Sequence, residues 1–117
     1  MPFFTPNVSN DAAINYSEAY ATVTTVTGDY TAQKADINTL VMVNSGTGKT
    51  VTLPANFPVG ACISFVQYGA GAVTFAAASG ATIPQGAAAT GSQYTIAAAI
   101  VVANADGASA VWIVSGV

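Results

Sequence analysis

One segment of the chain has the residue types of a phosphate-binding loop. Gly46-Thr47-Gly48-Lys49-Thr50 matches the end of that motif, in which backbone amides and a lysine hold phosphate. The full motif needs a further glycine at position 43, where this chain has Val43, and a helix after the threonine. The next residues, Val51-Thr52-Leu53-Pro54, alternate like a strand. The segment therefore predicts a hairpin turn and not a nucleotide site.

Acidic residues are the next candidates, as an acid–base pair or as ligands of a cation. Asp29 and Asp36 are close in sequence, but nothing in the pattern makes them converge in a cleft, as a catalytic pair must. Asn7, Asn10 and Asp11 offer oxygen ligands without the spacing of a calcium loop. Turn, cap and surface roles suit these residues better. We expect no catalytic residue, no metal site and no cofactor.

Three further features combine reactive or aromatic side chains. Cys62 lies in an alternating apolar run and is expected to be a small buried residue. Gln67-Tyr68 and Gln93-Tyr94 have the groups of a sugar-binding surface, although polar strand ends are the commoner explanation. Alternation places Trp112 on the face opposite its two neighbours. There it is either part of the core or the anchor of a subunit contact.

The composition of the whole chain excludes several classes of function. The 117 residues include no histidine and one cysteine, so a histidine base and a thiolate zinc site are excluded. Two basic residues and a net charge of −3 cannot neutralise many phosphates, which argues against nucleic-acid binding. The longest run free of turn and polar residues, 96–103, is far shorter than the ~20 residues of a membrane-spanning helix, and no signal-peptide pattern is visible. We expect a non-enzymatic protein, made in a cytoplasm, with neither nucleic acid nor membrane as a partner.

Strands are the elements that must position these residues. The large residues are β-branched or aromatic and alternate with small or polar ones, which is the pattern of half-buried strands. Gly69-Ala70-Gly71 and Ala105-Asp106-Gly107 separate two pairs of runs and have the length of hairpin turns. The runs cover 21–27, 40–43, 50–53, 61–67, 72–76, 93–102 and 110–114. We predict one all-β domain over residues 21–117, an antiparallel β-sandwich or a small β-barrel without an internal repeat.

Residues 1–20 differ from the rest of the chain because they lack strand alternation. Pro2 and Pro6 disfavour a helix and keep the segment extended. Phe3 and Phe4 would be a liability on a free tail. We interpret residues 1–20 as an extended N-terminal arm that docks on another subunit, the alternative being that it packs across its own domain. The candidates for subunit contacts are Pro2, Phe3, Phe4, Pro6, Phe57 and Trp112.

The small side chains also predict self-association. Ordering the chain costs about 1.5 kcal/mol per residue, and burial returns about 25 cal/mol per Å² of apolar area. Alanine, glycine and threonine offer little such area, and Leu40 and Leu53 are the only leucines. No charged residue occurs between Lys49 and Asp106, so much of the surface is cheap to desolvate. We expect a stable homo-oligomer, a trimer or a larger assembly, and binding to a partner that salt weakens little.

A series of short motifs runs through residues 40–114. The motifs are LVMVNS (40–45), VTLP (51–54), FPVG (57–60), ISFVQYGAGAVTF (63–75), GATIP (80–84), QY (93–94) and VWIV (111–114). Their order resembles a small β-domain of tailed-bacteriophage structural proteins. Such domains occur in tail fibres and tail-associated proteins, and similar domains stand alone as head decoration proteins. The resemblance implies a trimeric, non-enzymatic virion component.

Because the sequence has only the arm before this domain, the resemblance favours a small multi-copy accessory protein. We therefore expect a capsid decoration (cement) protein on the capsid surface of the virion. Its partner is then the major capsid protein, whose neighbouring subunits it would bind and stabilise. The alternative is a tail-fibre or head-fibre-like protein, in which loops such as 55–59 and 86–92 contact a host surface.

Overall fold

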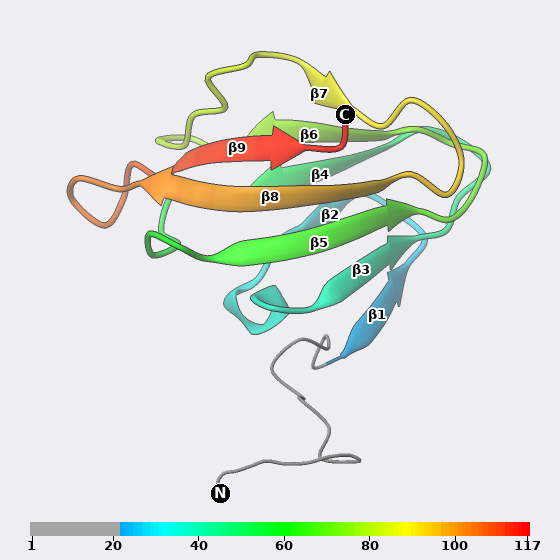
Figure 1. Cartoon of the computed structure of the whole chain (residues 1–117), viewed down its shortest axis with the longest axis horizontal. Coiled ribbons are helices and arrows are strands. Elements are labelled where there is room, and N and C mark those ends of the chain that lie inside the picture. Colours follow the sequence, from blue (N-terminus) through cyan, green and yellow to red (C-terminus); the bar gives the residue numbers. More distant parts are fainter. Residues whose placement is uncertain (1–21) are drawn as a thin grey trace, which may run out of the picture.

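The computed structural model describes residues 22–117, and this part of the chain is all-β (Figure 1). Besides the strands it has one short 3₁₀ turn, η2 (Lys34–Asp36). The strands are β1 (Val23–Val26), β2 (Tyr30–Thr31), β3 (Leu40–Val43), β4 (Lys49–Leu53), β5 (Cys62–Gln67), β6 (Val73–Ala77), β7 (Ala88–Ala89), β8 (Ile96–Ala103) and β9 (Val111–Ser115). Each predicted run contains a strand. The two-residue strands β2 and β7 are too short to produce a visible alternation.

The strands form two mixed sheets, one in the order β1-β3-β5-β8-β9 and one in the order β2-β4-β6-β7. From β1 to β6 the chain passes from one sheet to the other at every strand. Consequently β1, β3 and β5 pair in parallel in the first sheet, as do β2, β4 and β6 in the second. Antiparallel pairs occur where β7, β8 and β9 join the sheets. The prediction of an antiparallel arrangement is therefore wrong for the first half of the domain.

By alternating between the sheets the chain coils around the core. Two successive turns of this coil, β3–β4 and β5–β6, lie directly on each other. Leu40 pairs with Ser64 in one sheet and Lys49 pairs with Val73 in the other, so both sheets keep the same offset of 24 residues. The connecting turns are stacked in the same register. The amide of Tyr68 donates to the Val43 carbonyl at 2.9 Å, and further along the turn the amide of Gly71 donates to the Ser45 carbonyl at 2.9 Å.

This stacking corrects two predictions. The glycine-containing segments after β3 and β5 are not hairpin turns, because each carries the chain from one sheet to the other. The coil is also an internal repeat of structure, which the sequence did not reveal. In contrast, Ala105-Asp106-Gly107 does lie in the connection between β8 and β9, which pair antiparallel as predicted.

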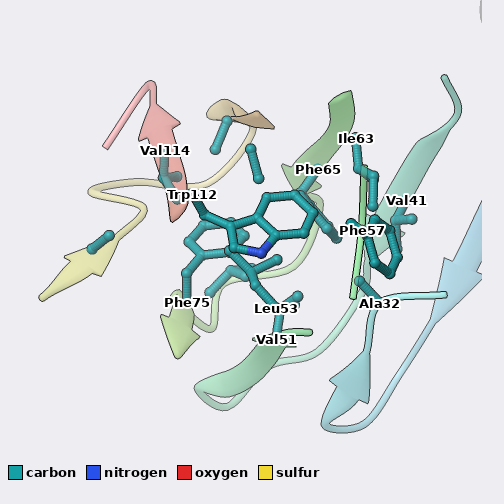
Figure 2. Packing of buried hydrophobic residues seen from close by; sticks show 14 of the residues in the cluster. Ala32, Val41, Val51, Leu53, Phe57, Ile63, Phe65, Phe75, Trp112 and Val114 are labelled. Atoms are coloured by element: carbon teal, nitrogen blue, oxygen red, sulfur yellow. The ribbon is translucent and has the colours of Figure 1, made fainter. Parts of the chain in front are cut away.

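One hydrophobic cluster draws on both sheets (Figure 2). The alternating residues that point inward are buried, such as Val41 on β3 and Val51 on β4. Aromatic rings fill its centre. The ring centroids of Phe65 and Phe75 lie 5.2 Å apart, and so do those of Phe57 and Trp112. The Trp112 Nε1–H donates to the Pro54 carbonyl at 2.8 Å, so its one polar group is satisfied.

The outer edge of β9 is covered by the segment before β7. The Trp112 amide donates to the Thr82 carbonyl at 2.8 Å. The Gln85 side chain then imitates a strand partner: its Nε2 donates to the Val114 carbonyl at 2.7 Å, and its Oε1 accepts from the Val114 amide at 2.8 Å. An edge covered in this way cannot recruit another strand.

Candidate interaction surface

The segment that resembles a phosphate-binding loop is a turn. Thr47 donates its amide to the Ser45 hydroxyl at 3.2 Å, and Lys49 already belongs to β4. A strand follows Lys49, so no helix terminus is present to receive phosphate. The structure confirms a turn at this position, although it joins two sheets.

The two candidate acids each support local structure. Asp29 is exposed, and its Oδ1 accepts from the Thr50 amide at 2.9 Å. Asp36 is buried in η2, where its carboxylate accepts from the Tyr30 hydroxyl at 2.7 Å and the Gln33 amide at 2.8 Å. Within residues 22–117 no group of acidic, histidine or cysteine side chains could hold a metal ion. The other predicted oxygen ligands lie outside the described residues: Asn7, Asn10 and Asp11.

The contact between Tyr30 and Asp36 predicts a loss of stability at alkaline pH. Burial, and next the hydrogen bond to Asp36, raise the pKa of Tyr30 to about 12 from 10.0. The folded protein holds this proton more tightly than the unfolded chain. Its stabilising effect is therefore complete below pH 10 and is lost as the pH rises through about 12. We expect Tyr30→Phe to remove this pH-dependent part of the free energy of unfolding. The difference in stability between wild type and variant should therefore narrow between pH 10 and about pH 12. Urea unfolding at a series of pH values measures it; a constant gap would contradict the prediction.

Two of the residues considered for sugar binding come together at the surface. Tyr68 and Tyr94 are exposed, with ring centroids 5.8 Å apart in an edge-to-face arrangement. The side-chain Nε2 of Gln93 donates to the Tyr68 carbonyl at 3.0 Å. Gln67 instead is buried, where it accepts from the Thr90 hydroxyl and donates to carbonyls of the following turn. The predicted pairs are therefore separated: the two tyrosines form an exposed aromatic contact, whereas Gln67 forms hydrogen bonds inside the domain.

Two candidates for subunit contacts lie in the core: Phe57, and Trp112, for which the core was one of two interpretations. Trp112 has no exposed surface and Phe57 retains 2%. Both rings pack against each other between the sheets, so the domain itself uses the apolar area that we assigned to a partner. The remaining candidates, Pro2, Phe3, Phe4 and Pro6, lie outside the described residues.

The outer face of the five-stranded sheet is apolar. Its strands β1, β3, β5, β8 and β9 contain no charged residue. On β8, Ile96 is 55% exposed and Ile100 is 37% exposed, and Ile113 on β9, which pairs with Ile100, is also 37% exposed. We define the apolar face by its outward-pointing apolar residues, which are Val23, Leu40, Met42, Cys62, Val66, Ile96, Ala98, Ile100 and Ile113. Three polar residues lie among them, Thr25, Ser64 and Ser115.

The outer face of the other sheet has a different character. Its outward-pointing residues are Thr31, Thr50, Thr52, Thr74, Ala76 and Ala89. Threonine suits a strand as well as isoleucine does, so strand propensity does not require isoleucine or methionine on the first sheet. The choice of large apolar residues there is therefore specific to that face, and exposed apolar patches of this kind mark sites of interaction.

Sequence reasoning missed this face for a definite reason. Alternation shows which residues of a strand share a side, but it does not show which strands are neighbours. The uncharged stretch between Lys49 and Asp106 was the available signal, and it contains both β5 and β8. Cys62, expected to be buried, is partly exposed on this face, since it pairs with the outward-pointing Ile100.

No helix of residues 22–117 is long and apolar enough to cross a membrane. The sequence matches no protein-family model and no curated protein. The arguments about function therefore depend on the surfaces of the domain and on the motifs in its sequence.

Proposed function

We propose that the chain is a non-enzymatic structural protein of a bacteriophage virion. In this proposal it is a capsid decoration protein that is made in the host cytoplasm, binds neighbouring major-capsid subunits and stabilises them. The observation that carries the proposal is the apolar face, which five uncharged strands present on the outside of the domain. A surface of this kind suits permanent protein contacts, whereas Asp29 and Asp36 accept hydrogen bonds from backbone amides of the domain itself.

We also propose that the two sheets form an open β-sandwich and not a barrel. Both sheets contribute inward-pointing residues to one cluster, and each sheet has two ends in its strand order. An open sandwich supports the proposed role because it leaves both outer sheet faces free for contacts with neighbouring proteins.

The proposed decoration protein is a homotrimer that meets the capsid through its N-terminal arm. The arm enters the domain at Thr22, whose carbonyl accepts from the Leu40 amide at 3.1 Å beside the edge strand β1. Only Asp11 and Glu18 are charged among the arm residues, so its contacts with the capsid would be apolar and through the backbone.

Immunogold labelling of purified virions tests the proposed role. We expect many copies distributed over the head, retained after a wash in about 1 M salt, because salt screens charged pairs and leaves apolar contacts intact. A few copies at the tail would favour the alternative role. Virions without label, with the protein present in infected cells, would contradict both.

The alternative is a tail-fibre or head-fibre-like protein that contacts a host surface. Two exposed side chains favour it: Val59, in loop 55–59, is 60% exposed, and Tyr94, which follows loop 86–92, is 65% exposed. Tyr94 also has a left-handed backbone conformation, with φ of 70°. Strained residues of this kind concentrate at contact sites.

A further inference from the structure

We infer that the apolar face is the surface through which copies of this chain pack on one another. The inference rests on the proposed function, because it names the surface that would hold the proposed trimer together. The exposed large side chains of this face are Val23, Ile96, Ile100 and Ile113. Small side chains lie between them, such as Ala98, so the surface is even enough for close packing.

The distribution of charge favours a second copy as the occupant. Identical chains with a net charge of −3 repel one another unless they meet through uncharged surface. Every charged residue of the described part lies outside the five-stranded sheet: Asp29, Lys34, Asp36, Lys49 and Asp106. A face without charge is complementary to itself, since apolar atoms meet apolar atoms in any copy. It offers no charge pattern by which to recognise a different, charged partner.

The width of the sheet matches the space inside a trimer. Five strands about 4.8 Å apart place the two outer strands about 19 Å from each other. Three such sheets, arranged as the sides of a triangular prism, each lie about 5.5 Å from the central axis, close to half of the ~10 Å between packed sheets. One layer of isoleucine, leucine and methionine side chains from each copy fills that space.

The area of the face sets the size of each contact. A strip of five strands and about five residues per strand has a footprint of about 400 Å², so a trimer buries about 1,200 Å² in all and about 400 Å² at each pair of copies. Each pair contact is smaller than a standard specific interface, so the three contacts must form together. The predicted arm is long enough to reach its own face, because Phe3 and Phe4 precede β1 by about 20 residues, or up to ~65 Å of extended chain. The test must therefore distinguish the arm from a second copy.

A charge placed on the face tests the inference on the full-length chain. Ile100→Asp would bring uncompensated carboxylates together in the centre of the assembly and raise its dissociation constant at least about a hundredfold. Thr74→Asp adds the same charge to an exposed position on the outer face of the other sheet and is the matched control. Sedimentation equilibrium should then report trimers for wild type and the control and monomers for Ile100→Asp, with the same circular dichroism for all three.

The single cysteine supplies a second measurement that needs no substitution. Cys62 lies on the apolar face opposite Ile100, and it is partly exposed in one copy. Its reaction with a water-soluble maleimide should be slow at concentrations where the wild-type protein is assembled and should accelerate on dilution. If Ile100→Asp fails to fold, the reaction rate of Cys62 still shows whether assembly covers the apolar face.

The possible failures are distinguishable. If the wild-type protein is a trimer whose Cys62 reacts at the same rate when assembled and diluted, and Ile100→Asp stays trimeric, the interface lies elsewhere while the proposed trimer stands. If the wild-type protein is monomeric with a protected Cys62, its own arm covers the face and the inference is wrong. If it is monomeric with a reactive Cys62, the proposed trimer and the inference both fail.

Discussion

Gly71→Ala should destabilise the domain by about 3 kcal/mol or more, a large share of the stability of a domain this size. A β-carbon on Gly71 would lie 2.0 Å from the carbonyl oxygen of Thr47 and 2.2 Å from its carbonyl carbon. Both atoms belong to the backbone of the turn on which Gly71 is stacked, so no side-chain rotation relieves the overlap. The two turns must separate, and the bond between the Gly71 amide and the Ser45 carbonyl is then lost. Urea unfolding at one fixed protein concentration measures the effect.

The matched control is Gly46→Ala in the turn beneath. No atom lies within 4 Å of a β-carbon at Gly46, and its φ is outside the left-handed region. We expect this variant to stay within about 0.5 kcal/mol of wild type. Gly69→Ala should resemble Gly71→Ala, because its β-carbon would lie 2.2 Å from the Ser45 carbonyl oxygen. Equal stability of Gly46→Ala and Gly71→Ala would show that the turns are not stacked.

These glycines explain why part of the fold was accessible from the sequence and part was not. Strands such as β5 and β9 were predictable because the inward-pointing residues of a strand must be apolar at every second position. A turn at 69–71 was predictable from its two glycines. Whether such a turn returns to the same sheet or crosses to the other is decided by what lies against it, and here that is a turn 24 residues earlier.

The same limit applies to the candidate surface. The absence of charge after Lys49 predicted a protein contact without saying where, and the structure divides that stretch between the two sheets. Trp112 had two interpretations, because alternation gives a residue a side of its strand without telling which side faces the second sheet. In the structure Trp112 pairs with Val101 of β8, and both lie on the side that faces the second sheet.

Trp112→Ala should cost about 3–5 kcal/mol, which would leave little or no folded protein. The indole is completely buried and lies 5.2 Å from the Phe57 ring. In a core built mostly of alanine and valine, few neighbouring side chains are large enough to move into the space that it leaves. Circular dichroism during urea unfolding measures the loss without depending on tryptophan fluorescence.

Trp112→Phe and Val59→Ala separate the contributions to this loss. Phenylalanine keeps an aromatic ring against Phe57 but removes the Nε1–H that donates to the Pro54 carbonyl, so we expect a cost of about 1–3 kcal/mol. Val59 is 60% exposed, and its truncation should change the stability by less than about 0.5 kcal/mol. If Trp112→Ala instead unfolds like wild type and loses only its self-association, the indole belongs to a subunit contact, as the sequence allowed. Retained stability together with retained assembly would mean that neighbouring residues close the space at no cost in free energy. The argument that this core has too few large side chains to do so would then be wrong.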